Sequence, residues 1–320
     1  MSNLPASVTI CEEGPREGFQ SESIVISTAE KIRFIEALAE TGVQEINCVS
    51  FVNPSRVPQM ADAEAVANGL RRRPGVLYTG TILNAAGFER ARKTPLDCLP
   101  VMFLSASETF GVRNSNKTRL QALEEQRELL AMYQTSGLIP EAAYVFTAFG
   151  CAYESDITPA TVVRAVADLL ELAKDLPMPR IVLCDTVGWA TPLSVERLVG
   201  ALRDRWPEVR LGLHLHDTRG MGIANAMSGL RLGVDHFDTS CGGLGGCPFA
   251  GNVAAAGNIA TEELVQMCEE MGVGTGIDLE RLIECAAMAE QIVGHALPSK
   301  VSRAGSIAAH RRRNADRLRS

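Results

Sequence analysis

Short runs of β-forming residues alternate along most of the chain with longer segments whose apolar positions recur every three or four residues. The short runs predict eight strands, at residues 8–13, 45–50, 77–82, 98–103, 143–148, 180–185, 209–216 and 236–240. Because strands that alternate with helices form a parallel sheet, eight such units predict an α/β fold, a closed (β/α)8 TIM barrel.

The segments with the helical period fit this plan. Ser27 precedes the first of them and Glu30 follows three residues later, which is the spacing of a capping box. Further helices are predicted at 161–176, 194–205, 262–271 and 279–293, and the last two are expected to pack on the barrel and help to cover it. No glycine-rich dinucleotide turn follows the first strand, which argues against an open Rossmann sheet.

The composition is that of one globular domain. The 320 residues are 46% hydrophobic and 22% charged, which suffices for one large core, and no shift in composition marks a second domain. We therefore expect a single (β/α)8 domain over residues 1–320. Residues 302–320 are rich in arginine and are expected to form a basic, flexible tail.

Charge and cysteine usage exclude several classes of protein. A net charge of −7 implies no basic surface, so nucleic acid is not an expected partner. No apolar run is long enough to cross a membrane and no secretory leader is visible, so we expect a soluble protein. Nine scattered cysteines without a C-x-x-C pair fit neither a disulfide framework nor a zinc knuckle, and they favour the reducing cytoplasm.

Polar side chains gather at the ends of the predicted strands. Asn47 and Ser50 lie on the second strand, Asp185 ends the sixth, and His214 and His216 end the seventh. In a barrel of this kind the carboxyl ends of the strands meet at one face, where active sites lie. The sequence therefore predicts one site that these residues share.

The two histidines predict a metal site. His214 and His216 are two residues apart, so on a strand both side chains face the lumen, where they can share an ion. Hydrogen-bonded core histidines are the alternative. A carboxylate is the natural oxygen ligand beside two imidazoles, and Glu17, just past the first strand, is the candidate. Its neighbour Arg16 is permanently charged, although a solvent-exposed ion pair is the plainer interpretation of this dipeptide.

A glycine-rich segment, residues 241–258, follows the last strand and is predicted to be a loop on the same face. Its Cys247 lies between a glycine and a proline. A thiol on such a loop can donate or accept a proton if its pKa suits the reaction. The alternative is a small apolar residue packed under the loop.

In these motifs the sequence resembles the 3-hydroxy-3-methylglutaryl-CoA lyase family, part of a larger group of metal-dependent TIM-barrel lyases and Claisen-type synthases. The matching stretches are GPREGFQ at 14–20, SFVNPSRVPQMAD at 50–62, CDTVGWATP at 184–192, HLHDTRGMGIAN at 214–225, GGLGGCPFA at 242–250 and GNIATEEL at 257–264. The similarity runs over nearly the whole chain, from 8 to 301.

The resemblance implies an enzyme that cleaves a 3-hydroxyacyl-CoA into acetyl-CoA and a keto acid with Mg²⁺ or Mn²⁺. The sequence does not indicate the oligomeric state, and we expect a homo-oligomer, a dimer, only because dimers are the commonest assemblies. The family pattern implies that the metal ligands are Glu17, His214, His216 and Asn258. It implies catalytic roles for Arg16, Asp185, Cys247 and His214, and it places Gln20, Asn47 and Ser50 near substrate and metal.

The implied mechanism is a retro-aldol (retro-Claisen) cleavage. The ion lowers the pKa of the substrate hydroxyl, and Asp185, alone or with His214, takes its proton. Arg16 stabilises charge on the oxygens while the carbon–carbon bond breaks. Cys247 then delivers a proton to the acetyl-CoA enolate as its loop closes.

Departures from the family pattern bear on the substrate. Glu17 stands in place of an aspartate and Asn47 in place of a glutamate. The spacing after Cys247 makes Asn252 a competitor of Asn258 as the asparagine ligand. We hypothesise that Glu17 and Asn47 are a matched pair tuned to another acyl group, so a citramalyl-CoA-type substrate stays open.

Two further functions stay open at this point. The same residues could run the condensing direction, as in the 2-isopropylmalate and homocitrate synthases, although those lack the GGCPFA loop. The changes at Glu17 and Asn47 would also suit a metal-binding barrel without catalysis. An intact Arg16, Asp185 and histidine pair argue against that interpretation.

Overall fold

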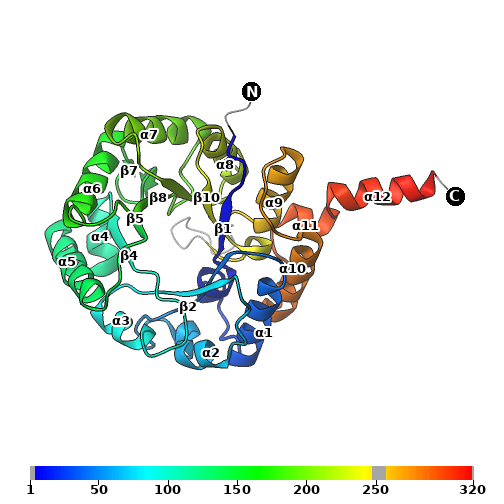
Figure 1. The fold of residues 1–320 in the computed structure, drawn as a ribbon, viewed down its shortest axis with the longest axis horizontal. Coiled ribbons are helices and arrows are strands. Elements are labelled where there is room, and N and C mark those ends of the chain that lie inside the picture. Colours follow the sequence, from blue (N-terminus) through cyan, green and yellow to red (C-terminus); the bar gives the residue numbers. More distant parts are fainter. Residues whose placement is uncertain (1–3, 247–256, 319–320) are drawn as a thin grey trace.

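The computed structural model describes residues 4–246 and 257–318. Eight parallel strands form one sheet that curls around a common axis, and helices surround it (Figure 1). The strands are β1 (Thr9–Glu12), β2 (Glu45–Ser50), β3 (Leu77–Thr81), β4 (Val101–Ser105), β5 (Ala142–Phe146), β8 (Arg180–Cys184), β9 (Leu211–His214) and β10 (His236–Thr239). Each overlaps one of the eight predicted strands, so the predicted (β/α)8 architecture is confirmed.

The largest shift from prediction is at β4, which begins three residues later than expected. Pro100 lies directly before the strand and has no backbone N–H to give to a ladder. A short antiparallel pair, β6 (Gly150–Cys151) with β7 (Ser155–Asp156), was not predicted. Two-residue strands are too short to produce a periodic pattern in the sequence.

The order of the strands places the first strand of the sheet, β1, next to the last, β10. The hydrogen-bonded order is β3-β2-β1-β10-β9-β8-β5-β4, so the first strand pairs with the last. Thr9 lies opposite His236, and Cys11 lies opposite both Asp238 and Glu45. β3 and β4 stand at the two ends of this order. Between them, the N–H of Asp97, in the segment before β4, donates to the carbonyl of Tyr78 in β3 at 2.7 Å.

Helices cover the outside of the sheet. They are α1 (Thr28–Ala39), α2 (Ala63–Gly69), α3 (Ala85–Ala91), α4 (Glu108–Ser115), α5 (Arg119–Thr135), α6 (Pro159–Leu172), α7 (Pro192–Arg205), α8 (Gly222–Arg231), α9 (Thr261–Glu270), α10 (Leu279–Val293), α11 (Lys300–Ala304) and α12 (Ile307–Arg317). Three short turns of helix are η1 (Gly14–Gly18), η2 (Pro58–Met60) and η3 (Cys241–Gly243). Among the described residues, no helix is both long and apolar enough to span a membrane.

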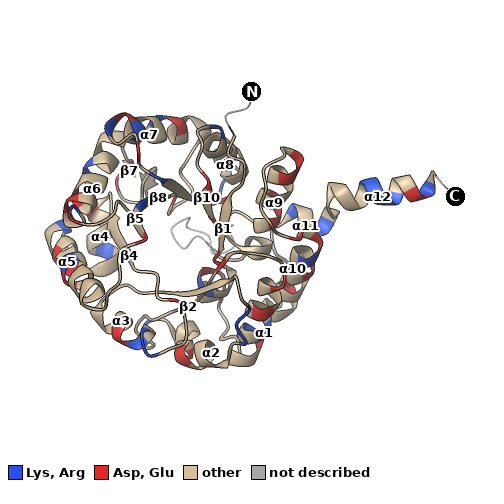
Figure 2. Cartoon of the chain, viewed as in Figure 1, with Lys and Arg blue, Asp and Glu red and all other residues tan. Residues whose placement is uncertain are grey.

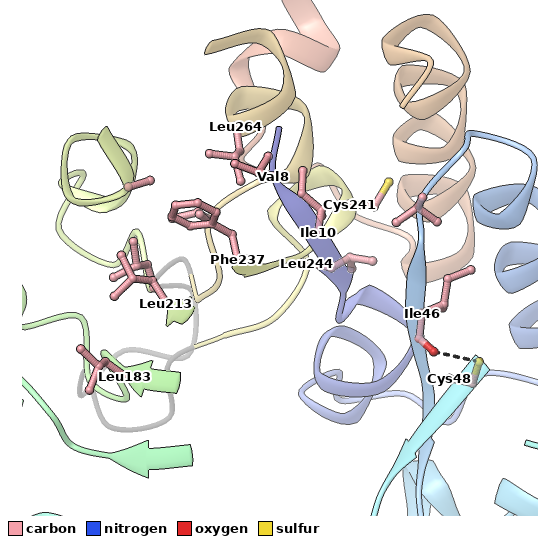
Figure 3. Packing of buried hydrophobic residues seen from close by; sticks show 14 of the residues in the cluster. Val8, Ile10, Ile46, Cys48, Leu183, Leu213, Phe237, Cys241, Leu244 and Leu264 are labelled. Atoms are coloured by element: carbon pink, nitrogen blue, oxygen red, sulfur yellow. Dashed lines mark hydrogen bonds between the residues drawn. The ribbon is translucent and has the colours of Figure 1, made fainter. Parts of the chain in front are cut away.

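Local sequence explains how the helices start and what they bury. Ser27 caps α1, because its hydroxyl accepts the N–H of Glu30 and donates to the Glu30 carboxylate at 2.9 Å. Leucine, isoleucine and phenylalanine side chains of the helices and strands form one continuous core between the two layers. Figure 3 shows part of it, including Phe237 of β10 and Leu264 of α9. This core holds the strand ends that carry the polar residues.

The arginine-rich C-terminal stretch contains the end of α11 and the whole of α12. Figure 1 shows α12 projecting away from the barrel, and Figure 2 shows that basic positions recur along α12, whereas acidic and basic positions are intermixed along the helices around the barrel. Arg311 contacts Glu270 of α9 at 2.7 Å, and Arg312 contacts Glu280 of α10 at 3.2 Å. These contacts involve exposed side chains, and the flexibility of this tail stays a prediction.

Candidate active site

The predicted site residues lie at the carboxyl ends of the strands. Asn47 lies within β2, Asp185 directly follows β8, His214 ends β9 and His216 lies two residues beyond it. Glu17 and Arg16 lie on η1, a π-helical turn that starts two residues after β1 and has Pro15 near its start. The turn folds back over the strand ends, because the N–H groups of Arg16 and Glu17 both bond to the carbonyl of Glu13.

Glu17 and the two histidines converge on one point. The Glu17 Oε1 atom lies 3.6 Å from His214 Nε2 and 3.4 Å from His216 Nε2. All three potential ligand atoms lie within 4.8 Å of one another, a spacing that could hold a metal ion. Burial alone would raise the pKa of Glu17, but the charges of Arg16 and His214 hold it well below its usual range. A carboxylate that stays ionised beside two imidazoles favours a divalent cation.

Asn258 provides an independent test of whether this cluster fits a metal. Its side chain is buried, yet neither its amide nitrogen nor its carbonyl oxygen has a hydrogen-bond partner among the described residues. An antiparallel backbone bridge pairs Asn258 with His216, and residues directly opposite each other in such a pair present their side chains on the same face. A buried polar group without a partner is costly unless something binds it. The donor set and this amide therefore fit a divalent ion.

A second carboxylate orients His214 from behind. Asp238 of β10 accepts a hydrogen bond from His214 Nδ1 at 3.1 Å, which leaves Nε2 facing Glu17. His236 Nε2 lies 3.4 Å from the same carboxylate, and Arg180 donates to His236 Nδ1 at 2.6 Å. Burial lowers the pKa of His214, but Glu17 and Asp238 outweigh it and raise the pKa well above its usual value. The negative charge responsible also attracts a cation.

Arg16 lies between two carboxylates. Its Nη1 contacts Glu17 Oε2 at 2.9 Å, and its Nη2 forms an ion pair with Glu13. Although burial lowers the pKa of Arg16, Glu13 and Glu17 outweigh it and raise the pKa further. Burial raises the pKa of Glu13 to about 7, with Arg16 opposing the shift. The guanidinium is therefore ionised and fixed, and the interpretation as a solvent-exposed ion pair is wrong because its side chain is only 16% exposed.

Asn47 forms its hydrogen bonds with a different acid from the one proposed in the sequence hypothesis. Its amide nitrogen donates to the Glu13 carboxylate at 3.1 and 3.2 Å and to Thr81 Oγ1 at 2.9 Å. The structure thus pairs Asn47 with Glu13 rather than directly with Glu17.

Asp185 has one oxygen held and one free for chemistry. Its Oδ1 accepts the backbone N–H groups of Trp189 at 2.6 Å and Ala190 at 3.0 Å, in the turn that follows β8. Its Oδ2 is buried and has no hydrogen-bond partner among the described residues. Burial raises the pKa of Asp185, and His216 opposes the shift. A raised pKa makes the carboxylate a better proton acceptor.

The remaining predicted residues have mixed outcomes. Ser50 is buried at the end of β2, and Gln20 follows η1 with a buried amide oxygen that lacks a partner in the described chain. Cys247 and Asn252 lie outside the described residues. Glu13 and Asp238 were not predicted as site residues. Alternation along the last strand places Asp238 on the face of His236, but only the pairing of Asp238 with His214 shows what it contacts.

The segment that leads into the glycine-rich loop is held by two buried acids. Glu12 accepts the backbone N–H of Cys241 at 2.7 Å and the hydroxyl of Thr261 at 2.6 Å. Glu262 accepts the backbone N–H of Gly242 at 2.8 Å. Burial raises the pKa of Glu12 to about 7 and that of Glu262 to about 8. Both carboxyl groups therefore hold the backbone of η3 in place.

Comparisons with known proteins cover nearly the whole chain. The HMGL-like family model matches residues 7–289. The Bacillus subtilis hydroxymethylglutaryl-CoA lyase YngG is 40% identical over 296 residues, which are 92% of this chain and 96% of the relative. A B. subtilis HMG-CoA lyase structure has a TM-score of 0.88 at 38% identity and covers 94% of this chain and 98% of its own. An Acinetobacter baumannii HMG-CoA lyase, in complex with coenzyme A and 3-methylmalate, has a TM-score of 0.86 at 36% identity, with coverage of 96% and 98%.

Proposed function

Because the chain belongs to the HMGL-like family, we propose that it is a carbon–carbon lyase that cleaves a 3-hydroxy-3-methylglutaryl-CoA-like 3-hydroxyacyl-CoA to acetyl-CoA and a keto acid. The observation that carries this proposal is the convergence of Glu17, His214 and His216 beside the fixed guanidinium of Arg16. A retro-aldol cleavage needs removal of the hydroxyl proton and stabilisation of the charge that develops on oxygen, and a bound ion together with a fixed positive charge would supply both.

We propose that Glu17, His214, His216 and Asn258 hold the ion, and that it is Mg²⁺ or Mn²⁺. Oxygen donors match the imidazoles in number in this set, and no thiolate of the described residues joins it. The ion, when bound, supplies a Lewis acid that lowers the pKa of the substrate hydroxyl. Asp238 orients His214 for this role through the second ring nitrogen.

The protein's own residues then move the protons. Asp185 is the proposed base, because its Oδ2 is free of partners in the described chain and its pKa is raised by burial. The guanidinium of Arg16 stabilises negative charge on the substrate oxygens as the carbon–carbon bond breaks. Cys247, in the glycine-rich segment of the sequence, is the proposed donor of the proton to the acetyl-CoA enolate.

The structure of the relative with coenzyme A and 3-methylmalate supports a CoA ester of a branched hydroxy acid as the substrate. We further propose that the protein works in the reducing cytoplasm, because all eight cysteines of the described residues are free thiols.

The proposal is tested by incubating the protein with a panel of 3-hydroxyacyl-CoA esters and Mg²⁺ and measuring release of acetyl-CoA. We expect cleavage of the 3-hydroxy-3-methylglutaryl ester or a close analogue, its loss on chelation, and its recovery with Mg²⁺ or Mn²⁺. Glu17→Gln should abolish metal binding, whereas Glu22→Gln changes a carboxylate paired with His295 and should not. Full activity in a verified metal-free sample would contradict the proposal.

A further inference from the structure

Glu13 is a buried carboxylate that the mechanism above leaves without a task. It directly follows β1 and is 2% exposed. Its carboxylate ion-pairs with Arg16 Nη2 and accepts two of the three hydrogen bonds described from the Asn47 amide, the third of which goes to Thr81. Burying a charge is costly unless its partners hold it, so these contacts identify where the carboxylate acts.

The two acids beside Arg16 have different second contacts. One oxygen of Glu17 faces Arg16 and the other faces His214 and His216, so this carboxylate is shared with the proposed metal site. Glu13 instead contacts two neutral groups besides Arg16, the amide of Asn47 at 3.1 Å and the thiol of Cys11 at 3.8 Å. Glu13 is therefore the partner that can hold the planar guanidinium in one orientation while Glu17 serves the ion.

The position of the Glu13 carboxylate is consistent with the presence of asparagine instead of glutamate at position 47. Asn47 stands where the sequence of the resembled family has a glutamate, and its amide nitrogen lies 3.1 Å from a Glu13 oxygen. The carboxylate and the amide face each other across neighbouring strands, β1 and β2. A second carboxylate at position 47 would lie beside Glu13, and like charges at this spacing disfavour the ionised pair. With Glu13 present, a glutamate at position 47 is therefore unfavourable.

We propose that Glu13 is a positioning residue for Arg16, and that it supplies, from the position directly after β1, the carboxylate that holds the guanidinium, with Asn47 of β2 as its neutral partner. The proposal rests on the proposed lyase function for its kinetic consequences. Its structural consequence, the orientation of Arg16, does not depend on which substrate is cleaved.

The test exchanges the two side chains. Glu13→Gln removes the charge and should lower kcat by about 10²-fold, with KM changed only a few-fold, because a displaced Arg16 no longer meets the developing oxyanion. Asn47→Glu alone should also lower kcat, since it brings two carboxylates together. The double variant Glu13→Gln/Asn47→Glu restores one carboxylate from the other strand and should recover at least about tenfold of the loss.

Glu12 is the matched control. It is the adjacent residue, is equally buried, and contacts Cys241 and Thr261 on the other side of β1. Asn47→Glu should not restore any activity that Glu12→Gln loses. Thermal unfolding and Mn²⁺ titration of every variant separate loss of fold or metal from loss of orientation. If Glu13→Gln does not fold, Glu13→Asp keeps the charge but retracts it, and it should lower kcat with little change in KM.

A Glu13→Gln or Glu13→Asp enzyme as active as the parent would overturn the proposal, and so would a double variant no better than Glu13→Gln. If the parent cleaves no CoA ester, the proposed function fails separately. Crystal structures then decide the inference, because Arg16 should leave its position in Glu13→Gln and return to it in the double variant. An unmoved Arg16 in Glu13→Gln would overturn it.

Discussion

Asp238 shows how a residue remote from the substrate can control the proposed ion. Its carboxylate accepts the Nδ1–H of His214, which leaves Nε2 of the same ring facing Glu17. Carboxylates behind metal-binding histidines fix the ring and increase its basicity, and their loss typically costs 10- to 100-fold in metal affinity.

We therefore expect Asp238→Asn to weaken Mn²⁺ binding by roughly 10- to 100-fold without unfolding the protein. Titration calorimetry with Mn²⁺ alone measures this, so the readout does not depend on turnover. Asp235→Asn, three residues earlier at an exposed position just before β10, is the control and should bind like the parent. Equal affinity in both variants would show that Asp238 only packs against the ring.

Cys247 carries a second prediction at this scale. If it is the proton donor to the enolate, Cys247→Ser should keep metal binding but lose about 10²-fold or more in turnover. Cys98→Ser changes a half-buried thiol before β4 and should retain parental turnover. Alkylation of Cys247 should also slow when product is bound. Parental activity in Cys247→Ser would assign the residue to packing.

Residue types and spacing could predict the proposed metal ligands, but not the residues that orient the site, Asp238 and Glu13. Two histidines at a spacing of two and a carboxylate past the first strand each carry a local signal, and the structure brings all three together. Asp238 and Glu13 carry no such signal. What they contact depends on strand register, and register is decided by the packing of the whole sheet.

At the scale of elements, the turn η3 is held by the buried acid Glu262, whose ionisation is opposed by its burial. Glu262 accepts the N–H of Gly242, the middle residue of η3, yet burial raises the pKa of Glu262 to about 8. An unfolded glutamate titrates near about 4.3, so between these values the folded protein holds a proton that the unfolded chain has released. The free energy of unfolding should therefore fall as pH rises through this window.

Glu262→Gln cannot ionise and should flatten this dependence, so its advantage over the parent grows from pH 5.5 to pH 8. Part of the pH dependence should remain in this variant, because the pKa of Glu12 is also raised, to about 7. Urea unfolding followed by tryptophan fluorescence measures the difference. Glu284→Gln, on the exposed side of α10, should keep the parental slope. A variant with the same pH dependence as the parent would mean that Glu262 is ionised in the folded state.

Element boundaries show where sequence patterns stop being informative. Strong periodic segments such as α10 were predicted with the same limits that the structure shows. At β4 a proline delayed the strand, and at β9 the ladder ended at His214 while the apolar pattern continued to His216. A pattern reports which face is buried, whereas a strand ends where its hydrogen-bond partners end.

For the whole molecule, the pairing of β1 with β10 determines when the site can assemble during folding. Glu17 follows β1 and His214 precedes β10, so most of the chain lies between the two sides of the ligand cluster. Contacts between residues so distant in sequence form late, because the entropy of closing the intervening chain must be met first. The ability to bind Mn²⁺ should therefore appear only in the slowest refolding phase, after the helices have formed.

Double-mixing experiments, in which refolding protein meets Mn²⁺ after increasing delays, measure this order against the recovery of helical circular dichroism. A chain truncated before β10 should gain helix but never bind the ion, while a chain lacking only α12 should refold and bind as the parent does. Metal capture that precedes amide protection of β10 would contradict this order. A nascent chain would then acquire its ion only once the last strand has been synthesised, so an incomplete barrel presents no working metal site to the cell.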